Sequence, residues 1–272
     1  MSAAAVEELT SLLGAGRISV DPADLETHAR DWSPRALLAR RAGVTPSLPV
    51  AVVRPSDVDE VARLLGWAED SSTPVVPFGG GSSVVQGIGG REHIVVDLSA
   101  LDHISEVDAK SRLVTAGAGV TGPRLRTALA GSGFMLGHEP QSHDISTVGG
   151  WVATRACGQL SAGYGGIEKL VAGLEAVLPG GRMIVSKVAP RRSTGPDLGA
   201  LMIGSEGTLG IITEVTLRVS PIPKTRADAC VRFDHMRDAI AACRALAQSR
   251  LTPTLVRAYD AEDSVLFTMG FD

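Results

Sequence analysis

The sequence predicts an α+β protein, and three observations support this fold class. Between about residues 48 and 100, candidate elements follow one another in the order strand, helix, strand, loop, strand. From about residue 113 to residue 219, short candidate strands alternate with turns, and one helix lies among them. The chain also holds 31 glycines and only 4% aromatic residues, which suits a compact protein with many tight turns. With 272 residues, 44% of them hydrophobic, the chain is long enough to bury a sizeable core.

The first unit is predicted from periodicity and from turn residues. Residues 1–17 read as a short amphipathic helix, and residues 50–53 read as a strand. The helix that follows is predicted to begin at Ser56 as N-cap, with Asp59 three positions later. Apolar side chains then recur at helical spacing, which predicts one buried face. The strands 73–76 and 94–96 complete the unit, and a glycine-rich loop separates them.

The second unit is predicted from short strands and one helix. Strands are expected at residues 113–116, 174–178 and 183–188, and a helix at 123–130 with proline in its first turn. Residues 211–219 alternate, with Ile211, Thr213, Val215, Leu217 and Val219 on the face expected to be buried.

Pro221 and Pro223 then mark a boundary, and a new pattern follows it. We expect a strand at residues 229–233, a helix at 235–248 and a second strand at 255–259. This βαβ pattern stops soon after it begins, and about 50 residues are too few to bury a good core alone.

Composition and charge argue against several classes of protein. The net charge of −4 argues against a general nucleic-acid or membrane-surface binder. Glu7 and Glu8 lie where a signal peptide would carry positive charge, and no apolar run is long enough for a membrane span. Cys157, Cys230 and Cys243 are an odd number at wide spacing, which predicts no disulfide framework. We therefore expect a protein of the reducing cytoplasm.

The most informative motif is the glycine run in "PFGGGSSVVQG", residues 77–87. It is not a phosphate loop of the Walker type, because no Gly-Lys-Ser/Thr follows. It is not the Rossmann fingerprint either, because Val84 stands where the third glycine should be. The run instead suggests a nest of backbone N–H groups turned toward an anion, with hydroxyl donors from Ser82 and Ser83. A flexible surface turn is the alternative for a glycine triplet taken alone.

Two further stretches rich in glycine and hydroxyl residues accompany it. Residues 204–210 read "GSEGTLG" and lead into the strand that starts at Ile211. Residues 138–158 read "HEPQSHDISTVGGWVATRACG". Its His138-Glu139 and His143 are spaced one residue too far apart for a zinc signature, and Pro140 disfavours the required helix, so no metal is expected. The combination of these loops favours a long, extended ligand such as a dinucleotide.

Taken together, these motifs resemble a known family. "PFGGGSSV", "GHEPQS…STVGGWVATRACG" and "PRRSTGPDLGALMIGSEGTLGIITEVTLRV" resemble the FAD-binding domain of the vanillyl-alcohol oxidase superfamily, also called PCMH-type. Within it, they are most similar to the alkyldihydroxyacetonephosphate synthases (alkylglycerone-phosphate synthases). The resemblance implies a two-subdomain FAD-binding fold followed by an incomplete βαβ cap domain. The expected divisions are an N-terminal helical lead (1–47), the FAD-binding domain (48–222) and the truncated start of a substrate cap domain (223–272).

The resemblance also implies which residues bind FAD. The first stretch, at residues 77–83, holds the pyrophosphate, and the second, at residues 141–150, makes further FAD contacts. The third, at residues 154–157, lies near the flavin ring, and the fourth, at residues 206–212, lies near the adenosine half. The residues implied are Pro77, Phe78, Gly79, Gly80, Gly81, Ser82 and Ser83; Gln141, Ser142, Asp144, Ser146, Thr147, Gly149 and Gly150; Thr154, Arg155, Ala156 and Cys157; and Glu206, Gly207, Thr208, Leu209, Gly210, Ile211 and Ile212.

This sequence departs from the family pattern at several positions. Gln141 stands where the synthases usually carry Asp, and Cys157 stands where they carry Ser. Relatives that attach FAD covalently have a histidine after the glycines of the first loop, where this chain has Ser82. The expected cofactor is therefore non-covalent FAD. No catalytic residue is assigned, because the family's proton donor, histidine cluster and phosphate-binding arginine lie beyond the region that matches residue 272.

Three functions remain open on the sequence alone. The first is a transferase that exchanges the fatty acid of acyl-dihydroxyacetone phosphate for a fatty alcohol, giving an ether-lipid precursor. The second is an FAD-dependent oxidoreductase acting on an alcohol or a 2-hydroxy acid. The third is a non-catalytic FAD-binding fragment that needs a partner chain. Expected partners are FAD, a small or lipid-like substrate if a cap is supplied, and a second copy of the chain through residues 225–272. No nucleic acid is expected.

Overall fold

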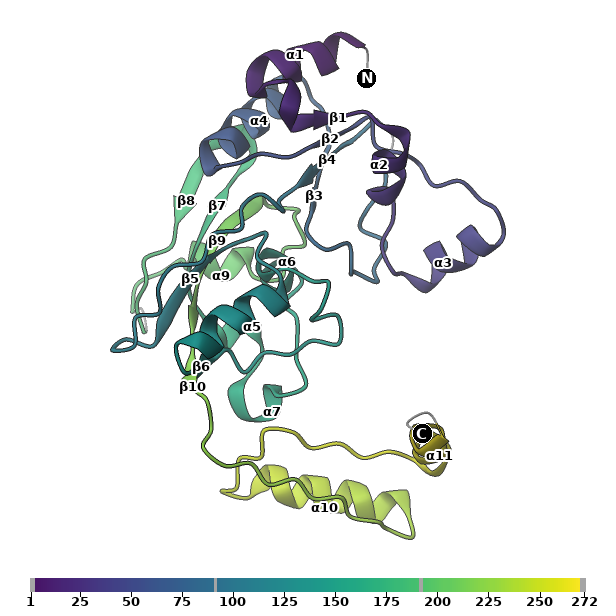
Figure 1. Ribbon diagram of the computed structural model, residues 1–272, viewed down its shortest axis with the longest axis vertical. Coiled ribbons are helices and arrows are strands. Elements are labelled where there is room, and N and C mark those ends of the chain that lie inside the picture. Colours follow the sequence, from purple (N-terminus) through teal and green to yellow (C-terminus); the bar gives the residue numbers. More distant parts are fainter. Residues whose placement is uncertain (1–2, 91, 191–192, 270–272) are drawn as a thin grey trace.

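The computed structural model describes residues 3–90, 92–190 and 193–269, and two four-stranded sheets organise them (Figure 1). The first sheet has the order β1-β2-β4-β3. Its strands are β1 (Ile18–Ser19), β2 (Ala51–Val53), β4 (Ile94–Asp97) and β3 (Val75–Phe78). The strands β2, β4 and β3 run parallel, and β1 pairs antiparallel with β2. The strand-helix-strand-loop-strand unit expected from the sequence is therefore confirmed.

Helices α1 (Ala3–Leu13) and α4 (Val58–Asp70) lie on the first sheet. Their apolar residues Leu9, Val61 and Leu64 are fully buried in one cluster with the residues of β2 and β4. The expected periodicity of α4 is confirmed, but its expected N-cap is wrong by one residue. The cap is Asp57, whose side chain accepts from the backbone N–H of Glu60 at 2.8 Å.

The second sheet is antiparallel throughout and has the order β5-β9-β7-β8. Its strands are β5 (Leu113–Gly117), β9 (Ile211–Arg218), β7 (Val171–Val177) and β8 (Met183–Val185). Around it lie α5 (Gly122–Gly131), α6 (Val148–Ala153), α7 (Ser161–Tyr164), α8 (Ile167–Leu170) and α9 (Leu198–Met202). The strands and the helix predicted for this region are thus present.

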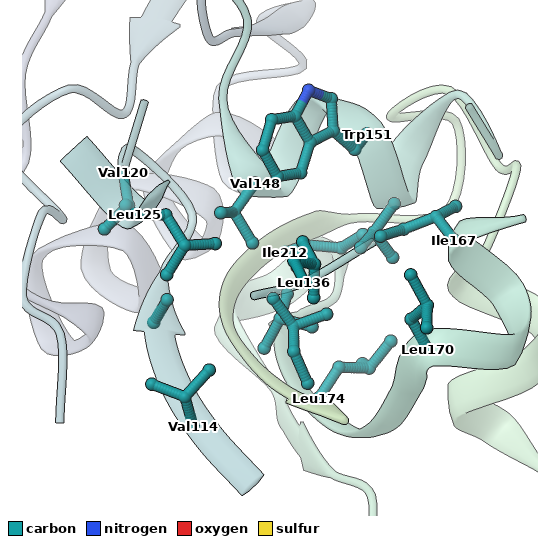
Figure 2. Packing of buried hydrophobic residues seen from close by; sticks show 14 of the residues in the cluster. Val114, Val120, Leu125, Leu136, Val148, Trp151, Ile167, Leu170, Leu174 and Ile212 are labelled. Carbon is teal, nitrogen blue, oxygen red and sulfur yellow. The ribbon is translucent and has the colours of Figure 1, made fainter. Parts of the chain in front are cut away.

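A second apolar cluster fills the space between this sheet and its helices (Figure 2). Val114 of β5, Leu125 of α5 and Ile212 of β9 point into it, and Trp151 of α6 closes its upper edge. The strand β9 alternates as expected at Thr213, Val215 and Leu217, but Ile212 is also buried. The reason is that Ile211 packs into the cluster under the first sheet while Ile212 packs into the second cluster. The start of β9 therefore joins the two subdomains.

Short elements connect the larger ones. A two-stranded sheet pairs β10 (Ser220–Pro221) with β6 (Phe134–Met135). The lead into the first sheet holds the 3-10 turn η1 (Ala15–Arg17) and helices α2 (Pro22–Thr27) and α3 (Pro34–Arg41). The turn η2 (Pro179–Gly181) joins β7 to β8 and packs on α4, where Gly181 approaches the backbone carbonyl of Ala62.

Beyond Pro221 the structure contradicts part of the expected βαβ pattern. The helix is present as α10 (Met236–Gln248), but residues 229–233 and 255–259 form no strand. These segments have no neighbouring strand to pair with in the described chain, and isolated strands are not stable in water. A further helix, α11 (Ala261–Met269), was not expected, and residues 270–272 lie outside the described residues. Figure 1 shows this segment apart from both sheets.

Two features of the structure concern the membrane span and the disulfide framework that were considered from the sequence. None of the helices that the structure describes combines the length and the apolar character needed to cross a membrane. Cys157, Cys230 and Cys243 are all free thiols, and the first two have exposed side chains.

Candidate functional site

The stretches singled out in the sequence come together around one cleft of about 380 Å³. The first stretch follows the end of β3, the second leads into α6, the third follows α6, and the fourth leads into β9. The cleft therefore lies where the carboxyl end of the first sheet faces the helices and β9 of the second subdomain. Ligands commonly bind at such an edge, where loops from several strands converge.

The first and second stretches pack backbone against backbone. A methyl group added at Gly79 would meet the Oγ1 of Thr147, and one added at Gly80 would meet the carbonyl oxygen of Ile145 and the Cα of Ser146. Both glycines have ordinary backbone conformations, since neither has a positive φ. These two positions therefore require glycine for contact between two loops of the protein, whereas the sequence suggested contact with the ligand.

Gly81 requires glycine for a different reason. Its φ of 62° lies in the left-handed region, and an added methyl group would lie 2.8 Å from the ring of Phe78. The first and fourth stretches meet in a similar way, because a methyl group at Gly207 (φ 78°) would lie 2.5 Å from the side chain of Pro77. Close packing on both sides thus fixes the path of the first loop.

Backbone hydrogen bonds join the end of α6 to the segment that leads into β9. The N–H of Gly204 donates to the carbonyl of Val152 at 3.0 Å, and that of Glu206 donates to the carbonyl of Ala153 at 2.9 Å. Arg155 and Glu206 both adopt left-handed conformations, with φ of 51° and 53°. The walls of the cleft are therefore held in place by contacts within the chain.

The donor groups of the first loop fit a bound anion. Among the described residues, no backbone N–H of residues 79–83 donates to a protein acceptor. A run of unpaired amides beside hydroxyl groups is the arrangement that binds phosphate groups. Ser205 also lines the cleft, and its buried Oγ has no hydrogen-bond partner in the described part of the chain. The cleft thus offers polar groups suited to a ligand with phosphates and further polar atoms.

Most of the residues implied by the resemblance line this cleft, and the others lie beside it. Gln141 and Asp144 are exposed, and Asp144 contacts the ring of His143 at 3.5 Å. The lining residues among those expected are Pro77, Phe78, Gly79, Gly80, Gly81, Ser82, Ser83, Ser142, Ser146, Thr147, Gly149, Gly150, Thr154, Ala156, Glu206, Gly207, Gly210, Ile211 and Ile212. Those outside the lining are Gln141, Asp144, Arg155, Cys157, Thr208 and Leu209.

Sequence reasoning missed the apolar wall of the cleft. Val84, Val85, Ile88 and Leu98 line it. Val84 and Val85 are exposed and lie side by side on the cleft, where they offer apolar surface to a ligand. Their position directly after the glycine run was the available signal. This wall suits a planar, partly apolar ring system.

Trp151 was also missed, and it organises the far side of the site. It is 2% exposed, lines the cleft and donates its indole N–H to the Oγ of Ser146 at 2.7 Å. His143 stacks on the indole at 5.8 Å between ring centroids, and Arg126 donates to its Nδ1 at 2.9 Å. Burial and the nearby Arg126 charge lower the pKa of His143. The ring is therefore a neutral acceptor at pH 7.

His138 packs edge-on against Trp151, with 5.1 Å between the ring centroids. It is 2% exposed, and neither ring nitrogen has a hydrogen-bond partner in the described residues. Burial lowers the pKa of His138 to about 4. In the part of the chain that the structure describes, no group of three or more histidine, cysteine, aspartate or glutamate residues could hold a metal ion.

The similarity of this chain to known proteins indicates its family. Residues 49–187 match the model of an FAD binding domain. The chain is 36% identical over 231 residues to an alkyldihydroxyacetonephosphate synthase of Caenorhabditis elegans, covering 83% of this chain and 39% of that protein. It is 34% identical over 264 residues to YgcU of Escherichia coli K12, named an uncharacterized FAD-linked oxidoreductase, covering 96% of this chain and 54% of that protein.

A solved structure named an alkyldihydroxyacetonephosphate synthase superposes with a TM-score of 0.76 at 31% identity, covering 83% of this chain and 41% of that one. This chain thus spans about two fifths to a half of the length of the proteins that it matches. The cofactor of the matched domain is FAD, and no histidine, cysteine or tyrosine suited to covalent attachment is among the lining residues of the cleft. The chain belongs to the FAD-binding PCMH-type family of flavoproteins.

Proposed function

We propose that the cleft binds FAD without a covalent bond, with the pyrophosphate on the first loop. The unpaired N–H groups of residues 79–83 support this placement most directly. Ser82 and Ser83 supply hydroxyl groups beside them. The stretch with Ala153, Thr154 and Ala156 receives the flavin ring, and Ser205, Glu206 and Gly207 receive the adenosine half.

We propose alkylglycerone-phosphate synthesis as the reaction in which this domain takes part. The support is its similarity to proteins named alkyldihydroxyacetonephosphate synthase, both in sequence and in structure. The flavin, when bound, supplies the reacting ring, while the residues of this chain bind it, orient it and shield one side of it from water. The substrates would be acyl-dihydroxyacetone phosphate and a fatty alcohol, and the product an ether-lipid precursor.

A second candidate is an FAD-dependent oxidoreductase acting on an alcohol or a 2-hydroxy acid. The observation that favours it is the 34% identity to the FAD-linked oxidoreductase YgcU over 96% of this chain. The lining of the cleft does not separate the two candidates, because it holds cofactor-binding groups that either reaction would use.

We further propose that the functional divisions follow the sequence boundaries, with residues 48–222 as the FAD-binding unit. Residues 225–272 would then mediate contact with substrate-binding parts or with a second copy of the chain. The support for this contact is a set of exposed apolar side chains, Val231, Ile240, Leu251 and Leu266, which are between 56 and 69% exposed. Light scattering of the purified chain would test self-association, and a monomer at all concentrations would contradict it.

The two reactions are separated by one set of assays on the FAD-loaded chain. Formation of alkyl-dihydroxyacetone phosphate from the acyl compound and a labelled fatty alcohol would support the synthase. Bleaching of the flavin absorbance by a 2-hydroxy acid such as D-lactate, without air, would support the oxidoreductase. Bound FAD with neither reaction would leave cofactor binding as the function of this chain, the third function open from its sequence.

A further inference from the structure

The N-terminal lead contacts the proposed pyrophosphate loop, although it lies before the region that matches the FAD binding domain, residues 49–187. Residues 28–33 follow α2 and lead into α3. Two of their polar groups form hydrogen bonds with residues 83–86, just beyond the glycines. These contacts join parts of the chain that are about fifty residues apart.

Asp31 makes the contact that is most unusual. Its side chain is buried, with the residue 5% exposed, and both carboxylate oxygens accept backbone N–H groups. Oδ2 accepts from Gln86 at 2.6 Å, and Oδ1 accepts from Ser33 at 3.0 Å. Such charge-assisted bonds are stronger than those between neutral groups.

Gln86 shows why this contact matters for the loop. Its φ of 61° places it in the left-handed region, which costs free energy for a residue with a side chain. The bond from its N–H to Asp31 holds the backbone in this conformation. The residue after Asp31 makes a second contact, since the N–H of Trp32 donates to the carbonyl of Ser83 at 2.8 Å. The end of the loop is therefore fixed by the lead.

The start of the loop is fixed by the lead as well. The ring of His28 lies 4.5 Å from that of Phe78, measured between centroids. Phe78 in turn packs under Gly81, the glycine with the left-handed backbone. His28 is held by Asp97 of β4, whose Oδ2 lies 3.3 Å from its Nε2, and Arg54 donates to the same carboxylate at 2.9 Å.

We propose that residues 28–33 are part of the FAD site and that Asp31 is a positioning residue for the pyrophosphate loop. Asp31 holds residues 83–86 so that the amides of residues 79–83 face the phosphates before FAD arrives. A loop that is already ordered before its ligand arrives loses less conformational entropy on binding, which raises its affinity for the ligand. The inference rests on the proposed placement of the pyrophosphate on the first loop.

Because Asp31 carries a negative charge, one substitution distinguishes its positioning role from an effect of its charge. A carboxylate near a pyrophosphate repels it, so its removal would strengthen FAD binding if charge alone mattered. Asp31→Asn removes the charge but also replaces one acceptor oxygen by an N–H₂ group facing a backbone N–H. The positioning role therefore predicts weaker binding, opposite to the effect of charge.

The matched control is Asp21→Asn in the same lead. Asp21 also accepts two backbone N–H groups, those of Ala23 and Asp24, but it uses a single oxygen for both and caps α2. Asparagine caps helices as well as aspartate does, so this change keeps the cap while removing the same charge. In the part of the chain that the structure describes, Asp21 forms no hydrogen bond or ion pair with residues 77–87.

The experiment is a titration of the FAD-free protein with FAD, at a temperature where each variant is folded by circular dichroism. Asp31→Asn should raise the Kd about tenfold, the effect of losing one bond to a charged acceptor, while Asp21→Asn should change it less than about twofold. The visible circular dichroism of bound flavin should also change in Asp31→Asn, which a purely structural loss of stability would not produce. Equal or tighter binding by folded Asp31→Asn would overturn the inference.

A second measurement needs no variant. Hydrogen exchange in the FAD-free wild-type protein should show the Gln86 amide protected, because the lead holds it without the ligand. Free exchange of this amide until FAD is added would overturn the positioning role. If the wild-type protein takes up no FAD at all, the proposed function fails instead, so the two failures are distinguishable.

Discussion

At the scale of single residues, the absence of one methyl group decides how the first loop packs. Gly80 lies so close to the backbone of Ile145 and Ser146 that any side chain would separate the two loops. Its φ is not positive, so steric contact rather than backbone conformation excludes other residues. The sequence signalled that something approaches these glycines closely, but it could not show that another loop of the same chain does so.

Gly80→Ala should therefore weaken FAD binding by more than about tenfold and lower the unfolding temperature as well, because interiors are close-packed and cannot absorb the methyl group. Gly131→Ala is the control, since an added methyl group there would meet no atom within 4 Å, its φ is not positive, and it lies outside the lining of the cleft. Calorimetry and FAD titration measure both effects. Wild-type behaviour of Gly80→Ala would mean that the two loops are not held together as described.

His138 makes stability depend on pH. Burial lowers its pKa to about 4, below the ordinary 6.5, so the folded protein favours the neutral ring. As the pH falls from 6.5 toward 4, the unfolded chain binds a proton at this residue and the folded chain does not. The free energy of unfolding therefore decreases in this window, by up to about 3 kcal/mol.

His138→Gln removes this titration, so its free energy of unfolding should fall less than that of the wild type between pH 6.5 and 4. Denaturant unfolding at several pH values measures the two slopes. His103→Gln is the control, because His103 has an exposed side chain that contacts Glu214 at the surface. Parallel pH curves for the wild type and His138→Gln would contradict the burial of an unpartnered imidazole.

At the scale of helices and strands, the sequence predicted an element correctly where its local residue pattern is matched by a neighbouring element with which it packs or pairs. The strands of both sheets except β1, and the helices α1, α4, α5 and α10, were expected from local patterns of apolar and turn residues. The strands expected at residues 229–233 and 255–259 were wrong, since a strand needs a neighbour and the structure gives these segments none in its described part. Local alternation alone cannot report whether such a neighbour exists.

The N-terminus of α4 shows the same limit within a few residues. Ser56, Asp57 and Asp59 are all residue types that cap helices, so the sequence left their roles ambiguous. The structure selects Asp57, because its Oδ1 accepts the N–H of Glu60 at 2.8 Å. The carboxylate of Glu60 in turn accepts the N–H of Ser56 at 2.7 Å. The two bonds satisfy one N–H group of the first turn, that of Glu60, and the N–H of the residue just before the cap.

Asp57→Ala should therefore lower the free energy of unfolding by about 1 kcal/mol, the usual effect of losing an N-cap. Ser56→Ala is the matched comparison and should have a smaller effect, because its backbone N–H bond to Glu60 remains. Urea denaturation of both variants measures the difference. A larger loss in Ser56→Ala than in Asp57→Ala would assign the cap to the residue first expected from the sequence.

At the scale of the whole molecule, the cleft arises from stretches that lie far apart in the chain. The sequence identified each stretch and their family resemblance, because glycine and hydroxyl residues cluster in them. It could not show their mutual packing, such as Gly207 on Pro77, or the contact of Asp31 with Gln86. It also placed Arg155 and Cys157 among the cofactor contacts, whereas both lie outside the lining of the cleft. Such contacts depend on how two subdomains and the lead fit together.

The central claim is that this cleft holds FAD with its pyrophosphate on the amides of the first loop. The most direct measurement is a crystal structure of the chain with FAD. The account predicts pyrophosphate oxygens within about 2.7–3.2 Å of backbone nitrogens in residues 79–83, and no covalent bond from the protein to the flavin. FAD bound at another surface, or a first loop whose amides turn away from the phosphates, would contradict it.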